Sequence, residues 1–237
     1  MGLQFYLAMD PSEIQRKLPD TGSIAWFSCQ FSPDGEDLSN LPRTLPEGSA
    51  LILDDGYLCR QLNTRSICRS LGLVAERLRL RAVVLDFQRP YIPLLGKLAH
   101  MLEQRLPCPL VAPKAYAVHT RGPVLLASIP LDVRPESWIG ASQRPVWLEL
   151  DNRCTRLALT PQGLQRSFAE GVIPQGNDFT SRELFCHYQI KAGSVPTFTL
   201  YRTGEDLTAL LEKLELLGVE AAIGLYQELK PLLTENG

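Results

Sequence analysis

Short runs of apolar residues alternate along the chain with stretches in which apolar residues recur every three or four positions. The runs are typical of buried parallel strands, and the stretches are typical of helices that cover a sheet. The expected strands are Leu3 to Met9, Ile24 to Phe31, Ala50 to Gly56, Ala82 to Gln88, Pro109 to Lys114, Val124 to Leu131, Val146 to Leu150 and Ala221 to Tyr226. The expected helices are Asp10 to about Leu18, Thr64 to Leu78, Leu94 to Leu106, Leu207 to Leu217 and Tyr226 to Leu233. This order predicts one α/β domain over residues 1–237, a (β/α)₈ barrel of the TIM type.

The pattern departs from a regular barrel at two places. The connection between the fifth and sixth expected strands is too short for an ordinary covering helix, so the barrel should be irregular on that side. Between Cys154 and Thr203 the pattern changes to short β-like pieces around a helix-like stretch from Pro161 to Glu170. This change predicts a small α+β insertion over residues 154–203, after the seventh strand.

The composition limits the partners that the chain can have. It is 45% hydrophobic and 21% charged, as in an ordinary soluble domain. Its 24 basic and 26 acidic residues give a net charge of −2 without a Lys/Arg run, so a nucleic-acid partner is not expected. No apolar stretch reaches the roughly 18 residues of a membrane span. The first ten residues lack the pattern of a signal peptide, so a cytoplasmic location is expected.

The six cysteines are spread singly along the chain, with no Cys-x-x-Cys pair. This spacing predicts neither a zinc site nor a disulfide framework. Cys186 and His187 are adjacent, but neighbouring residues on a strand point to opposite faces, so a thiol–imidazole pair is not expected. The chain also has no Gly-x-Gly-x-x-Gly, P-loop or Gly-x-Ser-x-Gly motif, and no cofactor is therefore expected.

Candidate functional residues collect at the carboxyl ends of the expected strands, where barrels carry their sites. Asp86 and Gln88 follow the most strongly apolar strand. The other candidates for ligand binding are Trp26, Asp54, Arg89, Lys114, Tyr116, Glu149, Asp151, Tyr226 and Gln227. Mixed charges with aromatic rings suit a sugar or another polyhydroxylated ligand. The alternative is that Asp86 forms a structural ion-pair network with Arg89 or Lys114 that fills the barrel mouth.

Asp54 and Asp55 form an acidic pair that resembles the paired carboxylates of a metal site. Adjacent strand residues point to opposite faces, so the two carboxylates are not expected to share one ion. A structural or turn role is the expectation for this pair.

Several local segments occur in the order found in a known family of barrels. They are Phe31-Ser32-Pro33-Asp34-Gly35 after the second strand, Pro109 to Lys114 at the fifth, Leu159 to Tyr188 in the insertion, and Thr197 to Leu225 at the end. In this arrangement the chain resembles glycoside hydrolase family 18, especially its bacterial spore-germination glycosidases. The resemblance implies a chitinase-like barrel whose ligands contain N-acetylglucosamine.

The chain departs from the diagnostic motif of that family, Asp-x-x-Asp-x-Asp-x-Glu. Arg81 and Val84 occupy the first two Asp positions, Asp86 matches the third, and Gln88 replaces the Glu that protonates the glycosidic oxygen. A primary amide cannot deliver that proton as a carboxylic acid does. The family's Tyr-Asp pair on the sixth strand is also missing, because Ser128-Ile129-Pro130 lies there, and Tyr226 stands where a Trp is common.

Three functions remain open from the sequence. The first is a non-catalytic barrel that binds an N-acetylglucosamine-containing glycan or a protein partner. The second is an active glycoside hydrolase with relocated acid chemistry at Asp86, Glu149 or Asp151. The third is a structural protein associated with sporulation. The sequence makes no prediction of the oligomeric state.

Overall fold

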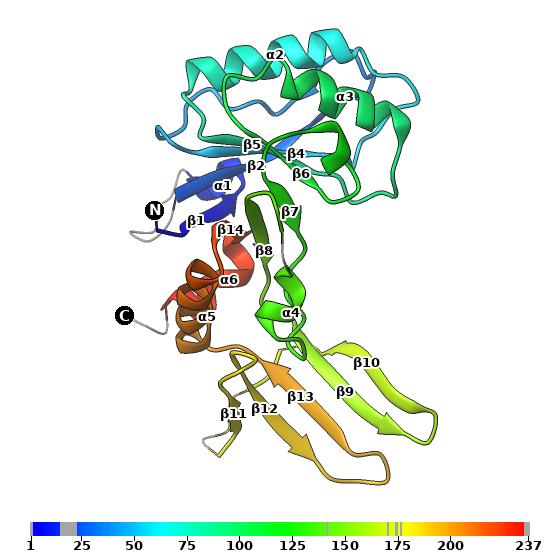
Figure 1. Ribbon diagram of the computed structural model, residues 1–237, viewed down its shortest axis with the longest axis vertical. Coiled ribbons are helices and arrows are strands. Elements are labelled where there is room, and N and C mark those ends of the chain that lie inside the picture. The colour runs from blue at the N-terminus through cyan, green and yellow to red at the C-terminus, as the bar shows by residue number, and fades with distance from the viewer. Residues whose placement is uncertain are drawn as a thin grey trace.

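The computed structural model describes residues 2–14, 23–140, 142–169, 171–173, 175 and 177–234, and eight parallel strands form its centre (Figure 1). The strands are β1 (Gln4–Met9), β2 (Ser23–Phe31), β4 (Ala50–Asp54), β5 (Ala82–Asp86), β6 (Leu110–Pro113), β7 (Val124–Leu126), β8 (Val146–Leu150) and β14 (Val219–Leu225). Strand β1 pairs with both β14 and β2, which closes the barrel. A two-residue strand, β3 (Leu38–Ser39), pairs with β2 in the antiparallel direction. The expected (β/α)₈ barrel is confirmed.

Helices cover the barrel, and all of them except the five-residue helix Pro135–Ile139 lie where the sequence pattern predicts a helix. They are α1 (Pro11–Ile14), α2 (Thr64–Arg77), α3 (Pro93–Glu103), α4 (Pro135–Ile139), α5 (Gly204–Leu216) and α6 (Tyr226–Thr234). The first expected helix continues to about Leu18, but residues 15–18 lie outside the described part of the chain. Among the helices of the described residues, none is both long and apolar enough to cross a bilayer.

The barrel is irregular on the side of β6 and β7, as expected. Only a 3₁₀ turn, η1 (Ala117–His119), connects these strands among the described elements. The Arg144 side chain secures the connection from outside: Nη1 donates to the carbonyl oxygen of Ala117 at 2.6 Å, and Nε donates to that of Gly122 at 3.0 Å. A single guanidinium thus supports a connection that lacks a covering helix.

Alternation along the strands separates two apolar layers. In β5, Val83 and Leu85 pack outward against the core beneath α2 and α3, whereas Ala82 and Val84 fill the barrel interior. In β8, Trp147 lies inside and Leu148 outside. Because the side-chain period of a strand is two, the next inward positions at the carboxyl ends are Asp86 and Glu149. The same alternation that builds the core therefore directs two carboxylates into the barrel mouth.

The insertion after the seventh barrel strand is a five-stranded antiparallel sheet that extends away from the barrel (Figure 1). Its strands are β9 (Cys154–Thr160), β10 (Gly163–Ala169), β11 (Phe179–Ser181), β12 (Cys186–Lys191) and β13 (Thr197–Tyr201). Its place in the chain agrees with the sequence, but its expected α+β character does not. The described residues of the insertion contain strands and no helix.

The helix expected from Pro161 to Glu170 is wrong. Gly163–Ala169 is strand β10, paired with β9, and Glu170 lies outside the described residues. Gly163, the first residue of β10 after the turn, has a φ of 114°, a backbone conformation that glycine adopts freely and other residues rarely adopt. The two large apolar residues of this strand, Leu164 and Phe168, are four positions apart, a spacing that a helix also allows, so the pairing with β9 and not the pattern makes this segment a strand.

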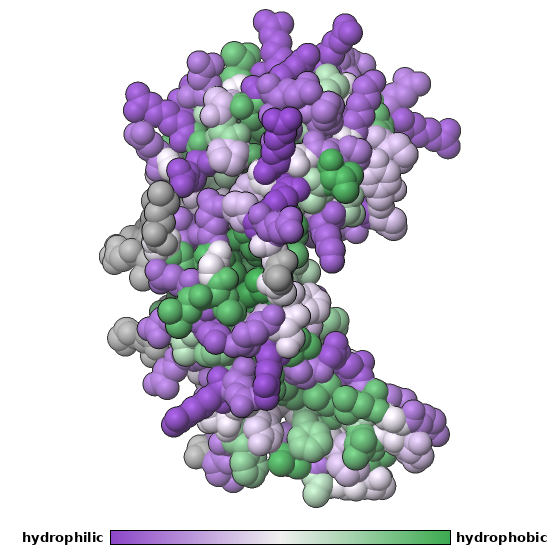
Figure 2. All heavy atoms as spheres, viewed as in Figure 1, coloured by the Kyte–Doolittle hydropathy of each residue, from purple (hydrophilic) through white to green (hydrophobic). Residues whose placement is uncertain are grey.

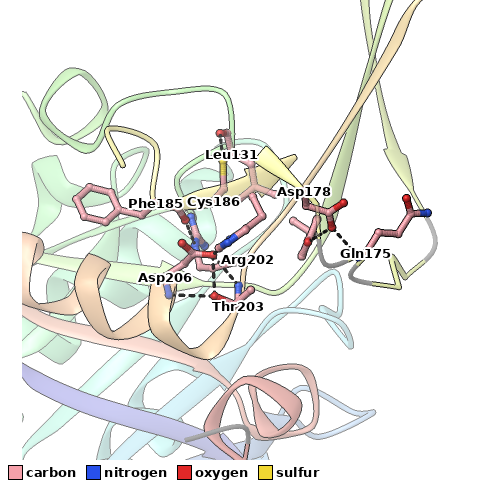
Figure 3. Close-up of polar contacts among 10 residues, drawn as sticks. Leu131, Gln175, Asp178, Phe185, Cys186, Arg202, Thr203 and Asp206 are labelled. Atoms are coloured by element: carbon pink, nitrogen blue, oxygen red, sulfur yellow. Dashed lines mark hydrogen bonds and ion pairs between the residues drawn. The ribbon is translucent and has the colours of Figure 1, made fainter. Parts of the chain in front are cut away.

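Buried polar contacts stabilise the end of the insertion that adjoins the barrel (Figure 3). Arg202 lies at the end of β13 and is buried, and its Nε donates to the carbonyl oxygen of Phe185 at 3.1 Å. The Cys186 thiol donates to the carbonyl oxygen of Leu131, which precedes α4, at 3.6 Å. Leu131, Cys186 and Leu200 form a small apolar core at this junction. These contacts anchor the sheet at its barrel end, and the ion pair of Arg166, in the middle of β10, with Asp132 adds a further attachment.

Candidate functional site at the barrel mouth

A cavity of about 230 Å³ opens at the carboxyl ends of the barrel strands. Its floor consists of inward-pointing apolar residues, among them Ile52, Val84, Leu125 and Ile223. Its polar lining consists of Asp86, Gln88, Ser128, Glu149, Asp151, Arg153 and Glu228. An apolar floor below a polar rim is the usual construction of a small-molecule site.

Asp86 and Gln88 contact each other at this mouth. The Gln88 side-chain amide donates through Nε2 to Oδ1 of Asp86. Burial raises the pKa of Asp86, the bond from Gln88 opposes this, and the charges of Asp54 and Asp55 raise the pKa further. Gln88 therefore occupies the motif position of the acid as a hydrogen-bond donor to Asp86.

Glu149 is the carboxylate with the most altered acidity in the cavity. Burial raises its pKa to about 7, and repulsion from Asp86 and Asp151 acts in the same direction, while Arg153 opposes the rise. A carboxyl group that titrates near neutral pH can both donate and accept a proton under physiological conditions. Glu149 is therefore the group in the mouth best suited to acid–base chemistry.

Asp151 is held in place by two donors. Its Oδ2 accepts from the Ser128 hydroxyl at 2.7 Å and from Nε of Arg153 at 2.7 Å. The Arg153 guanidinium carbon also lies 4.8 Å from the ring centre of Phe168 in the insertion, a cation–π contact. This chain of contacts links the barrel mouth to the insertion sheet.

A second hollow adjoins the first. Ala8, Phe27, Leu225 and Glu228 line both. The second hollow is also lined by Asp10, Glu13, Ser28, Gln30, Asn40 and Gln227. The predicted residue Gln227 thus lies beside the cavity that holds Asp86 and Glu149, and the two hollows together extend the mouth across the barrel.

Three predicted residues instead support turns or the outer core. Oδ1 of Asp54 accepts from the backbone N–H of Gly56 at 2.7 Å, and Nη2 of Arg89 donates to the carbonyl oxygen of Gly56 at 3.0 Å. The Trp26 indole donates to the carbonyl oxygen of Asn40 at 2.8 Å, and its ring packs against the core outside the barrel.

The remaining predicted residues lie outside both hollows. Tyr116 is fully buried, and its hydroxyl accepts from the backbone N–H of Ile92 at 3.0 Å. Tyr226 packs against the core beneath α5 and α6, and Lys114 is exposed after β6. The structure therefore brings together Asp86, Gln88, Glu149, Asp151 and Gln227 at the mouth, and it places Trp26, Asp54, Arg89, Lys114, Tyr116 and Tyr226 elsewhere.

The structure also bears on the alternative of an ion-pair network that fills the mouth. Within the described residues, neither Arg89 nor Lys114 forms an ion pair with Asp86. Arg89 is directed to Gly56 instead, and the cavity beside Asp86 stays open. Among the described residues, Arg89 and Lys114 therefore do not form the ion-pair network considered for this mouth.

Sequence reasoning did not select Ser128, Arg153, Glu228 or Phe27 as ligand-binding residues, although all four line the cavity. Arg153 and Glu228 each lie three residues beyond the end of a barrel strand. A search extended to the third residue beyond every strand would have included both of them.

The adjacent carboxylates of Asp54 and Asp55 accept hydrogen bonds from different backbone groups. Asp55 is buried and accepts from the backbone N–H groups of Gln88 at 3.1 Å and Arg89 at 3.3 Å, whereas Asp54 faces Gly56. Within the described part of the chain, no group of three or more His, Cys, Asp and Glu side chains is arranged to hold a metal ion.

Cys186 and His187 point to opposite sides of β12. Burial raises the pKa of the Cys186 thiol to about 12, so the thiol stays protonated at neutral pH. Nδ1 of His187 lies 2.8 Å from Oδ2 of Asp206 on α5. Asp206 also accepts from the backbone N–H of Thr203 (Figure 3). The His187 imidazole is therefore part of a helix-capping network.

No family model matches the chain, and no curated protein matches it in sequence. Several solved structures match in fold. The Bacillus cereus spore cortex-lytic enzyme SleL matches with a TM-score of 0.59 at 12% identity, over 99% of this chain and 74% of that one. The chitinase-like agglutinin RobpsCRA from Robinia pseudoacacia matches with a TM-score of 0.61 at 12% identity, over 97% of each chain. The class V chitinase from Nicotiana tobaccum matches with a TM-score of 0.59 at 11% identity, over 94% of this chain and 93% of that one.

These likenesses establish the fold. The closed barrel and the near-complete coverage agree with the arrangement expected from the sequence. The protein is a (β/α)₈ barrel that resembles the chitinase-like barrels of glycoside hydrolase family 18.

Proposed function

We propose that the barrel mouth binds an N-acetylglucosamine-containing glycan without cleaving it. The observation that carries this proposal is the cavity itself, which stays open although an amide, Gln88, stands at the motif position of the catalytic acid. Two structures with this fold give support by their names. One is a chitinase-like agglutinin, and the other is a Glu→Gln mutant of a class V chitinase in complex with NAG4.

The chemistry of the cavity suits a sugar ring. The apolar floor offers a surface to the C–H face of the ring, and Asp86, Asp151 and Glu149 offer oxygens that accept from hydroxyl groups. Arg153 and Ser128 add donors. The cavity of about 230 Å³ is smaller than the roughly 300 Å³ at which sites for drug-sized ligands begin, so one ring fills it, and the neighbouring hollow receives the next.

Isothermal titration calorimetry with the N-acetylglucosamine tetramer and with muropeptides tests this proposal. The wild-type chain is expected to bind at least one of them, and Asp151→Asn is expected to bind about tenfold more weakly, because it replaces a charged acceptor held by Ser128 and Arg153. Glu212→Gln, on the exposed face of α5, serves as the matched control and should bind like the wild type. Absence of heat with both ligands would reject glycan binding and leave a protein partner as the ligand of this mouth.

A second candidate function, glycoside hydrolysis with a relocated acid, is favoured by one observation. Glu149 lies in the cavity beside Asp86 with its pKa raised to about 7, which is the acidity that a general acid requires. In this alternative Glu149 donates the proton to the glycosidic oxygen that Gln88 cannot supply.

Turnover of fluorogenic N-acetylglucosamine substrates separates the two functions. Hydrolysis through Glu149 requires turnover that declines above about pH 7 and disappears in Glu149→Gln but persists in Glu212→Gln. The binding proposal predicts no turnover by the wild type across this range. Turnover that survives Glu149→Gln would exclude Glu149 as the acid.

A role in sporulation stays a prediction from the sequence resemblance. The spore cortex-lytic enzyme SleL shares the fold, but at 12% identity the likeness extends to the fold alone. Pull-down from sporulating and vegetative cells remains the test of that hypothesis.

A further inference from the structure

Strand β10 forms one edge of the insertion sheet. The strand order is β10-β9-β13-β12-β11, and among the described residues no strand pairs with the outer side of β10. Figure 1 shows β10 at the rim of the sheet. Seven residues, Gly163–Ala169, therefore present one side of an extended backbone to solvent.

The hydrogen-bond pattern shows which backbone groups are free at this edge. The N–H of Leu159 in β9 donates to Pro196 at 3.0 Å, on the side of β13, so Leu159 does not bond to β10. In an antiparallel pair, bonded and non-bonded positions alternate. Leu159 is opposite Leu164 in the register, so the N–H and C=O groups of Leu164, Arg166 and Phe168 point away from β9.

The side chains of this edge are unusually apolar for a solvent-exposed strand. Leu164 is 61% exposed and Phe168 is 68% exposed. They share a sheet face with Leu159 and Ile190, which are also exposed, and Figure 2 shows hydrophobic side chains gathered over this part of the molecule. The strand contains no Pro and no Lys, two residues that commonly protect edge strands from pairing.

We propose that two copies of this chain pair through β10 into an antiparallel dimer with a continuous sheet. The twofold axis passes through Arg166, which lies opposite the partner's Arg166. Leu164 then lies opposite the partner's Phe168, and Gln165 lies opposite the partner's Ser167. In this register every outward N–H and C=O of Leu164, Arg166 and Phe168 finds a partner, which gives about six main-chain hydrogen bonds.

The charges of the two Arg166 side chains at the twofold axis are compatible with this register. Two opposed arginines would repel each other if they were free. Arg166 is paired through Nη2 with Oδ2 of Asp132, a side chain that is only 14% exposed. Each copy therefore brings a neutral ion pair to the axis, and the guanidinium groups lean toward their own carboxylates.

The arrangement of the elements also permits the dimer. The sheet is attached to the barrel at the Cys154 end of β9, and the β9–β10 turn lies at the far end. Antiparallel pairing places the two barrels beyond opposite ends of the joined strands, so they do not collide. The opposite edge, β11 (Phe179–Ser181), has three residues, so pairing through β10 ends at two copies.

The size of the contact predicts a weak dimer. The exposed parts of Leu164 and Phe168 in two copies contribute on the order of 500 Å² of side-chain surface, by the usual area of large apolar side chains. With the backbone edges included, the contact stays near the lower limit of about 1,200 Å² for specific interfaces. The dimer should therefore dissociate on dilution.

Analytical ultracentrifugation of the full chain with the variants Leu164→Pro and Leu164→Ala tests the pairing. The Leu164 N–H points away from β9, so Pro removes a donor from the edge and none from the β9–β10 ladder. We expect the wild type to approach twice the mass of one chain as concentration rises, and Leu164→Pro to stay at the mass of one chain. Leu164→Ala keeps the N–H and should retain part of the dimer. Circular dichroism checks that both variants fold.

Cysteine cross-linking tests the register. Gln165 and the partner's Ser167 form a non-bonded pair with Cα atoms about 4.5 Å apart, which is within disulfide range. The double variant Gln165→Cys/Ser167→Cys should form disulfide-linked dimers, whereas either single variant places its thiol opposite a native residue and should not exceed the wild-type background. A wild type that keeps the mass of one chain at its highest soluble concentration would overturn the proposal. So would equal dimerisation of Leu164→Pro, or equal cross-linking of the single and double variants.

Discussion

Glu149 shows how the position of one residue in a strand decides its chemistry. It follows the inward-facing Trp147 by two positions on β8, so the alternation of the strand directs its carboxylate into the mouth. Burial there raises its pKa from 4.5 to about 7. The folded protein therefore binds the Glu149 proton more tightly than the unfolded chain does, and this difference makes stability depend on pH.

Glu149→Gln should remove that dependence. Because the folded pKa is raised, the unfolding free energy of the wild type falls as pH rises from about 4.5 to about 7 and stays lower above that range. The variant has no charge to bury. We expect it to be more stable than the wild type at pH 8, by about 1 to 3 kcal/mol, with a much smaller difference at pH 5. Urea denaturation at both pH values measures this.

The exposed Glu212 on α5 provides the control for this prediction, since Glu212→Gln should change stability little at either pH. An equal effect of Glu149→Gln at pH 5 and pH 8 would show that the carboxyl group is not perturbed in the folded state.

At the residue scale, the sequence predicted the mouth residues of β5 and β8 correctly but not every residue selected at a strand end. Asp86, Gln88, Glu149 and Asp151 were all selected from strand ends, and all line the cavity. Tyr116 follows β6 and was selected for the same reason, yet it is fully buried under the α3 side of the barrel. Beyond a strand end the direction of a side chain depends on how the loop turns, and the alternation no longer predicts it.

At the element scale, the N-terminus of α5 joins the insertion to the barrel. The Thr203 side chain accepts from the Asp206 N–H, and Asp206 accepts from the Thr203 N–H, which together form a capping box. Asp206 also pairs with His187 of β12. The Asp206 carboxylate thus contributes to the capping box of α5 and also links this helix to β12 through His187.

Asp206→Ala should lower the unfolding free energy by about 1 to 2 kcal/mol, because it removes one half of the capping box and the partner of His187, and it leaves the backbone N–H of Thr203 without its acceptor. Asp206→Asn keeps an acceptor oxygen for Thr203 but loses the charge beside His187, so its loss should be smaller. Thermal denaturation of the wild type and the two variants shows whether Asp206→Ala loses more stability than Asp206→Asn. A variant Asp206→Ala as stable as the wild type would show that the cap does not contribute.

Helices and strands were predictable from the sequence where the hydrophobic pattern continued over many residues. The barrel strands and α2, α3 and α5 lie close to their expected ranges because a buried strand or an amphipathic helix requires a sustained pattern. The seven residues of β10 were too few to separate a period of two from a helix by inspection, and the three residues of β11 gave no signal. Strand β7 ends at Leu126, earlier than expected, and Ile129 beyond it packs in the outer core.

At the scale of the whole molecule, the alternation of inward and outward side chains along the barrel strands produces both the apolar interior and the lining of the mouth. Inward positions fill the interior of the eight strands up to Val84 and Trp147, and the next inward positions form the site. The insertion sheet, by contrast, has a single layer, and its apolar face is only partly covered near the barrel. The sequence predicted where the insertion occurs, but pairing between distant strands decided its form.

A crystal structure of the chain with the N-acetylglucosamine tetramer is the most direct test of the central claim that the barrel mouth is a glycan-binding site. The account predicts an intact sugar ring in the cavity, in contact with Asp86, Gln88 and Glu149, with the next ring directed toward the hollow that contains Gln227. A tetramer bound only at another surface, with the mouth closed or filled by protein side chains, would contradict it.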